Sequence, residues 1–350
     1  MDTVVRAAGF GLALAAIAVC AVARAADSSP TLARVRATGV LRCGIDAEEA
    51  EYSTSDDHGN RAAFDADLCR AVAVAVLGKN ALVTVKPYPD DLAAMRGLAG
   101  GEVEMVPTLT DDFSHAAGSH LQFTLPVLWD GAGFLVPGTS PPTRARQLSG
   151  RKICLLAETA VEESVRAWFA REHLDFVPFP FQEEGEMQAA FATGNCGALA
   201  GDRTRLAQTR AALARHGKRS RLLPDVISKD PLAAATRDGD PQWSAIVQWA
   251  MNVLVQAEES GVAQANAQAM RSRAMQAQCD DPLLRFLLGG SRQIGGALGL
   301  DDDWVARVIQ ATGNYGEVYA RDLGGAPMEL PRGENNLRSH GGALVALPPR

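Results

Sequence analysis

Along the first part of the chain, segments with the hydrophobic pattern of a strand are followed by segments with the hydrophobic pattern of a helix. This order predicts alternating strands and helices. Short apolar or β-branched runs predict strands, whereas stretches with helical periodicity, an acidic start and a glycine stop predict helices. The expected strands cover 40–46, 81–88, 102–110 and 131–137, and the expected helices cover 64–78 and 90–101.

The same order returns after a Pro/Ser/Thr-rich connection at 138–150. Strands are expected at 151–159, 175–181 and 196–202, and helices at 160–172, 183–194 and 203–217. The segment 220–228 leads out to a strand and turn at 231–240, and helices follow from 240–261 to 301–324. Two βαβ blocks of similar size predict an α/β protein with two parallel-sheet lobes.

Two such lobes predict where a ligand binds. Ligands of open α/β sheets bind beyond the carboxyl ends of the strands, so two facing lobes would line a shared cleft with their strand-end loops. The loops at 47–57, 108–115 and 157–162 then matter most, together with Asp202 at a fourth strand end.

The first 25 residues have the pattern of a secretory signal peptide. A single cation, Arg6, precedes the apolar run 9–22, and Ala23-Arg24-Ala25 fits a small-x-small cleavage site before Ala26. The alternative is a membrane anchor, but the run of about 14 residues is shorter than the ~20 that span a bilayer. We therefore expect export into a bacterial periplasm.

Composition and charge disfavour several classes of protein. The 350 residues include 34 Lys plus Arg against 41 Asp plus Glu, a net charge of −7 with no long basic run, so no nucleic-acid partner is expected. The hydrophobic share of 47% is typical of a globular protein. Because no zinc spacing, phosphate-binding loop or hydrolase motif occurs, we expect no cofactor, no metal and no enzyme activity.

Five cysteines follow the signal segment. An oxidising compartment favours disulfides, and four cysteines permit three pairings. We expect the pairs Cys43–Cys69 and Cys154–Cys196, each joining a strand end to a nearby element of its own lobe, with Cys279 free or partnered elsewhere. The alternative is that all five are small buried hydrophobic residues.

Several long motifs span the rest of the chain: TLARVRATGVLRCGID, DDHGNRAAFDADLCRAVAVAVLG, RKICLLAETAVEESV, GNCGALAGDRTRL and GLDDDWVARVIQATGNYGEVYARDLG. In this order they resemble the periplasmic solute-binding proteins of polar amino-acid ABC transporters (solute-binding family 3), and most of all the general L-amino-acid-binding branch. The resemblance implies a type II periplasmic-binding fold, in which two α/β lobes are joined by two crossing segments and close around a ligand.

The resemblance also implies boundaries and partners. It places lobe 1 at 30–136 plus 230–330, lobe 2 at 139–224 and a C-terminal surface tail at 331–350, with crossings near 135–139 and 224–229. It further implies a monomer that carries a small solute, an amino acid or an amine, to the permease subunits of an ABC transporter in the inner membrane.

The carboxylate-binding position of the family is altered in this sequence. In the family, a loop threonine followed five residues later by an arginine grips the ligand carboxylate, for which the arginine fork is well suited. Here Thr110 keeps the hydroxyl, but His115 replaces the arginine. Losing that contact should cost on the order of 2–5 kcal/mol of binding. Asp111 and Asp112 add negative charge to the same loop.

The second lobe departs less. Relatives carry Gly-Thr-Thr at a strand-to-helix turn where this chain has Glu158, Thr159 and Ala160, so one hydroxyl is lost and a carboxylate is added. Backbone N–H groups at the helix start can still meet an anion. The family's ammonium-binding aspartate is retained as Asp202, and Tyr52 supplies a candidate aromatic wall.

Each site residue also has an ordinary structural interpretation. Asp202 precedes a helix and can act as its N-cap. His115 can be an exposed loop residue, Tyr52 can be ordinary packing, and Glu158 can interact with a helix dipole. Asp111 and Asp112 can cap a turn and face water.

The altered positions keep an anion for an amine and lose the cation for a carboxylate. We therefore expect a cationic or neutral amine-bearing solute, or an amino acid bound weakly in a changed pose. Two other functions remain open. One is a dehydratase with Glu158 or Asp202 as general acid or base. The other is a periplasmic accessory or sensor protein that has lost amino-acid binding.

Overall fold

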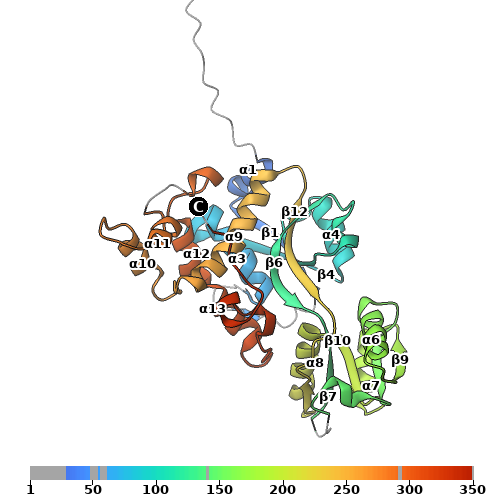
Figure 1. Cartoon of the computed structure of the whole chain (residues 1–350). Coiled ribbons are helices and arrows are strands. Elements are labelled where there is room, and N and C mark those ends of the chain that lie inside the picture. Colours follow the sequence, from blue (N-terminus) through green and yellow to red (C-terminus); the bar gives the residue numbers. More distant parts are fainter. Residues whose placement is uncertain (1–28, 48–53, 56–60, 139–141, 291–293, 349–350) are drawn as a thin grey trace, which may run out of the picture.

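The computed structural model describes residues 29–47, 54–55, 61–138, 142–290 and 294–348, which form two α/β lobes (Figure 1). The expected signal segment and Tyr52 lie outside the described residues. Within the described ranges, no helix is long and apolar enough to cross a membrane.

Lobe 1 is built around a mixed sheet. Strands β1 and β4 run parallel, and a bridge between Cys43 and Met105 links β1 to the segment that enters β5. Strand β12 pairs antiparallel with both β5 and β6. The strands are β1 (Val40–Asp46), β4 (Leu82–Tyr88), β5 (Val106–Thr110), β6 (Leu121–Asp130) and β12 (Asp230–Arg237), with a short hairpin of β2 (Thr54–Ser55) and β3 (Arg61–Ala62).

Helices bury one large hydrophobic core with this sheet. Trp243 and Trp304 are almost fully buried within it, and Leu337 and Leu344 from the C-terminal tail join the same core. The tail is thus partly a core segment, because it contributes these apolar side chains. The helices are α1 (Pro30–Thr38), α3 (Phe64–Leu77), α4 (Asp91–Ala99), α5 (Phe113–Ala116), α9 (Pro241–Glu259), α10 (Ala267–Ala274), α11 (Pro282–Leu287), α12 (Trp304–Thr312) and α13 (Tyr315–Tyr319).

Lobe 2 is a five-stranded sheet in the order β11-β7-β10-β8-β9, with apolar side chains on both faces. Along β7, Phe134 and Val136 pack in one core with α6, whereas Leu135 packs in another with α7 and α8. The elements are β7 (Ala132–Pro137), β8 (Lys152–Leu156), α6 (Ala160–Arg171), β9 (Val177–Phe181), α7 (Glu184–Ala192), β10 (Ala198–Asp202), α8 (Arg203–Arg215) and β11 (Ser220–Leu222).

The chain crosses between the lobes earlier than the sequence predicts. Strands β6 and β12 run from lobe 1 toward lobe 2 (Figure 1), and β7 already pairs with β10 in the second sheet. The first crossing is therefore at Gly131 rather than near 135–139, so residues 132–136 belong to the second sheet. A Cβ at Gly131 would lie 2.5 Å from the carbonyl oxygen of Ser228 in the returning segment, so this crossing requires glycine.

The helical segment expected at 301–324 contains two helices in the structure. Helix α12 ends at Thr312, and α13 begins at Tyr315. Gly313 between them has a φ of +86°, and Asn314 caps α13 in a reciprocal capping box with Glu317. These two residues stop one helix and start the next although the apolar spacing continues.

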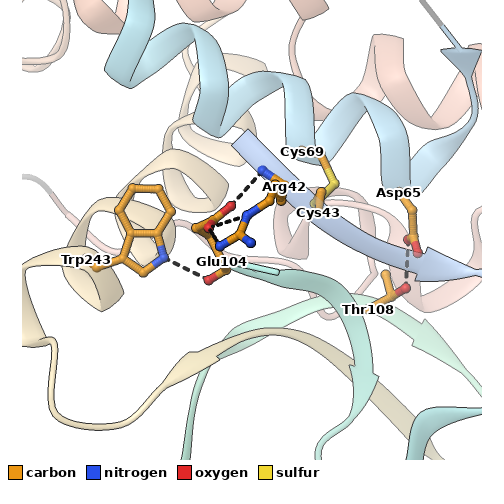
Figure 2. The surroundings of a disulfide bond; sticks show 7 residues. All are labelled: Arg42, Cys43, Asp65, Cys69, Glu104, Thr108 and Trp243. Atoms are coloured by element: carbon orange, nitrogen blue, oxygen red, sulfur yellow. Dashed lines mark hydrogen bonds and ion pairs between the residues drawn. A yellow bond between two sulfur atoms is a disulfide. The ribbon is translucent and has the colours of Figure 1, made fainter. Parts of the chain in front are cut away.

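Two disulfides are present, and each lies within one lobe. Cys43 on β1 is bonded to Cys69 on α3 (Figure 2), and Cys154 on β8 is bonded to Cys196 just before β10. Cys279 is free and buried. The structure thus contains both pairs expected from the sequence.

A buried carboxylate lies beside the first disulfide (Figure 2). The Glu104 side chain accepts hydrogen bonds from the Arg42 backbone N–H at 2.6 Å and from the Arg42 Nε at 2.9 Å, and it pairs with Arg34 at 2.9 Å. The Glu104 carbonyl accepts from the Trp243 indole at 3.0 Å. Glu104 therefore joins α1, β1 and α9.

We expect a Glu104→Ala substitution to lower the free energy of unfolding by about 2–3 kcal/mol, because a buried backbone donor and two guanidinium groups lose their partner. Urea denaturation of the purified protein measures this change. Glu163→Ala on α6 is a control that should change the value by less than about 0.5 kcal/mol. A loss as small as the control's would contradict the role assigned to Glu104.

Candidate functional site

The junction of the two sheets brings aspartates together from distant parts of the sequence. In the β6–β12 ladder Asp130 is paired with Asp230, and in the β10–β7 ladder Asp202 is opposite Ala132, just across the crossing. Three carboxylates thus lie where both lobes meet the crossing strands.

A fourth aspartate reaches this junction from α4. Asp91, in the first turn of α4, accepts a hydrogen bond from the Thr110 backbone N–H at 3.1 Å. The Thr110 hydroxyl lowers the pKa of Asp230 against the effect of burial, and the Asp111 N–H donates to the Pro231 carbonyl at 2.8 Å, which holds the end of β5 against β12. We refer to Asp91, Asp130, Asp202 and Asp230 as the floor cluster.

Within the floor cluster, Asp130 has a structural role. Its buried carboxylate accepts hydrogen bonds from the backbone N–H groups of Arg203 and Thr204, at 3.1 and 3.2 Å, and from the Thr204 hydroxyl. These N–H groups are the free donors at the start of α8. Asp202 occupies the N-cap position of this helix, but its side chain accepts no hydrogen bond from them. Asp202 is thus released from the capping role that its sequence position suggests.

The Asp202 carboxylate has no hydrogen-bond partner within the part of the chain that the structure describes. Burial, together with the charges of Asp130 and Asp230, raises its pKa to about 7, and only Arg205 opposes this shift. Burial and the charge of Asp130 likewise raise the pKa of Asp230 to about 6. A bound cation would relieve both effects, because it would neutralise the repulsion between these carboxylates.

The loop that carries Thr110 provides no unengaged cation. Asp112 caps the short helix α5 by accepting the His115 backbone N–H at 2.8 Å, and its carboxylate also lies 2.8 Å from the His115 Nδ1. Although burial opposes it, these hydrogen bonds lower the pKa of Asp112. Burial and the Asp112 charge raise the pKa of Asp111. Capping thus accounts for Asp112 and positions His115.

The start of α6 in lobe 2 is occupied by a carboxylate of the chain itself. Thr159 is the N-cap and accepts from the Glu162 N–H at 3.3 Å, while Ala160 begins the helix. The backbone N–H of the exposed Glu158 donates to the Glu162 carboxylate at 2.9 Å, and that carboxylate also binds Arg166. Glu162 therefore competes with any ligand anion at this helix terminus.

One ion pair joins the two lobes at the carboxyl end of β1. The Arg205 Nη2 on α8 lies 2.8 Å from the Asp46 Oδ2, and both side chains are about one-third exposed, at 29% and 32%. Neither residue was predicted from the sequence. The position of Asp46 at a strand end was a usable signal, as was the Thr-x-x-Glu spacing for Glu162.

The structure thus brings Thr110 and Asp202 to one junction and places His115 and Thr159 in local capping interactions. Asp91, Asp130 and Asp230 join the junction without having been predicted. Among the described residues, no group of three or more His, Cys, Asp or Glu side chains could hold a metal ion.

Known proteins resemble the chain over almost its full length. The general L-amino acid-binding periplasmic protein AapJ of Rhizobium johnstonii is 35% identical over 339 residues, which cover 95% of this chain and 96% of that protein. The glutamate/glutamine/aspartate/asparagine-binding protein BztA of Rhodobacter capsulatus is 34% identical over 334 residues, covering 95% and 97%. No family model matches the chain.

A solved structure agrees with these relatives. A periplasmic binding protein of an ABC transporter from Brucella ovis, with glutathione bound, has a TM-score of 0.78 and 34% identity, covering 91% of this chain and 99% of that one. Both the sequence and the two-lobed architecture thus point to one group of proteins. The chain belongs to the periplasmic solute-binding proteins of amino-acid ABC transporters, solute-binding family 3, and has their type II periplasmic-binding fold.

Proposed function

We propose that this protein binds an amine-bearing solute with a net positive charge and presents it to the permease of an ABC uptake system, without transforming it. The observation that carries the proposal is the half-buried Asp202 carboxylate, whose pKa is raised by desolvation and by the charges of Asp130, Asp230 and Asp91, and which accepts no hydrogen bond from the described residues. Asp202 is the ammonium partner, and the Thr110 hydroxyl completes the described part of the site. An aromatic wall at Tyr52, outside the described residues, stays a prediction from the sequence.

Selectivity follows from the two altered anion positions. His115 is held by Asp112, and the α6 terminus is occupied by Glu162, so neither offers a full positive charge to a ligand carboxylate. An acidic solute would be repelled by the carboxylates of the floor cluster, and no cation at these two positions would offset that repulsion. We therefore place cationic solutes first, neutral amino acids second and acidic amino acids last.

Isothermal titration calorimetry with L-arginine, L-lysine, agmatine, L-glutamine, L-glutamate and glutathione tests this order. At pH 8 we expect the cationic probes to bind at least about tenfold more tightly than L-glutamine, since one unscreened charge contact is worth more than 1.4 kcal/mol. Sub-micromolar binding of L-glutamate or of several neutral amino acids would contradict the altered pocket.

Affinity for a cationic probe should also depend on pH. A cation binds the ionised carboxylate, and Asp202 and Asp230 have pKa values of about 7 and about 6. Affinity should therefore fall as the pH decreases from 8 to 5.5, and binding near pH 7 should release protons. Titrations in two buffers with different ionisation enthalpies measure this release. Lack of binding by every probe would favour the accessory or sensor function instead.

A further inference from the structure

Arg205 is the cation that acts on the proposed ammonium partner. It lies three residues after Asp202, in the first turn of α8, and its charge lowers the pKa of Asp202 against the effect of burial. The guanidinium points from lobe 2 across to Asp46 at the end of β1 in lobe 1, 2.8 Å away. It therefore lies between the two halves and beside the floor cluster.

Two other arginines of α8 are engaged elsewhere. The buried Arg203 side chain donates to the Leu223 carbonyl at 2.7 Å, in the returning crossing segment. Arg210, farther along α8, donates to the Met328 carbonyl and lies 3.6 Å from Glu329. Arg205 differs from both because Asp46, the partner that the described residues give it, is a partly exposed carboxylate, which a ligand carboxylate can replace without leaving a buried charge unpaired.

We propose that Arg205 binds the carboxylate of the solute, which displaces Asp46, while the solute ammonium meets Asp202. This inference rests on the proposed function and deepens it, because it names the solute class as a cationic α-amino acid. The solute carboxylate thus replaces the Asp46 carboxylate on the Arg205 guanidinium. The positively charged side chain of the solute then interacts with the other aspartates of the floor cluster.

If the solute carboxylate displaces Asp46, two substitutions should change the affinity for an amino acid in opposite directions. Arg205→Gln removes the carboxylate partner, whereas Asp46→Asn removes the competitor for it. An ion pair that only holds the lobes together would respond differently, because both substitutions would then alter closure equally for every solute.

The test compares amino acids with their decarboxylated analogues by calorimetry at pH 8. The pairs are L-arginine with agmatine and L-lysine with cadaverine. We expect Arg205→Gln to weaken binding of the amino acids by about 30-fold or more and to change binding of the analogues by less than about threefold. Asp46→Asn should strengthen amino-acid binding severalfold, and Arg205→Lys should restore part of what Arg205→Gln loses.

Arg210→Gln is the matched control on the same helix and should leave the ratio between amino acid and analogue unchanged. Thermal unfolding of each variant verifies that it is folded. Equal weakening of amino acid and analogue by Arg205→Gln would overturn the assignment of Arg205 while leaving the proposed function intact. Absence of wild-type binding to all four probes would overturn both.

Discussion

An Asp202→Asn variant should lose L-arginine binding by roughly 100-fold or more and, when free of ligand, should be more stable than the wild type at pH 8. The first effect follows from removal of the anion that meets the solute ammonium. The second follows from burial, which together with neighbouring carboxylates raises the pKa of Asp202 to about 7. An ionised Asp202 is thus an unfavourable group in the folded protein, and the proposed function assigns this group to ligand binding.

The sign of the stability effect depends on pH. Because the pKa of Asp202 is higher in the folded state than in the unfolded state, the folded state binds the proton more tightly, and wild-type stability falls as the pH rises from about 4 to about 7. Asparagine does not titrate, so the variant should lack this part of the decline. Its advantage at pH 8 should be on the order of 2–4 kcal/mol.

Calorimetry with L-arginine and urea denaturation at pH 5 and pH 8 measure the two effects. Asp280→Asn, at an exposed position in lobe 1, is the matched control and should change neither quantity. If Asp202→Asn binds L-arginine as tightly as the wild type, Asp202 is not part of the site. If the free energy of unfolding declines equally with pH in both proteins, ionisation of Asp202 does not destabilise the folded state.

Replacing Cys154 and Cys196 together by alanine should lower the free energy of unfolding of lobe 2 by about 3–4 kcal/mol. The disulfide closes a segment with a sequence separation of 42, and the entropy that it removes from the unfolded chain grows with that length. The effect is large for lobe 2 because its two cores are small compared with that of lobe 1.

Urea denaturation reports this loss when it is followed by the fluorescence of Trp168 in lobe 2, with the other four tryptophans replaced by phenylalanine in both proteins. The Cys279→Ala variant removes a free thiol and should cost about 1 kcal/mol or less, which separates the loss of a bond from the loss of a sulfur atom. A loss in the double variant no larger than that of Cys279→Ala would show that the bond adds little.

The sequence predicted local structure better than it predicted the joining of distant parts. The periodicity of α3, α6 and α8 and the β-branched run of β4 were clear enough to place these elements within a few residues. The crossing was misplaced because residues 125–137 form one largely apolar stretch, interrupted by Asp130, Gly131 and Gly133. Local pattern does not show to which sheet each half belongs.

The same limit applies to the site. The position of Asp202 at the junction was predictable because it ends a strand, which is local information. The proximity of Asp130 to Asp230 arises from strand register, and the Arg205–Asp46 contact arises from the reach of a side chain between lobes. Neither register nor reach is encoded in spacing along the chain.

The disulfides have a consequence for how the chain matures. Each bond joins two cysteines that are consecutive in the chain beyond residue 28, and both partners of each lie in a single lobe. A chain threading through an export channel from its N-terminus would therefore release each correct partner directly after the first, so oxidation in order of emergence yields the native bonds without isomerisation. Since neither bond spans the crossing segments, oxidation places no covalent link between the two lobes.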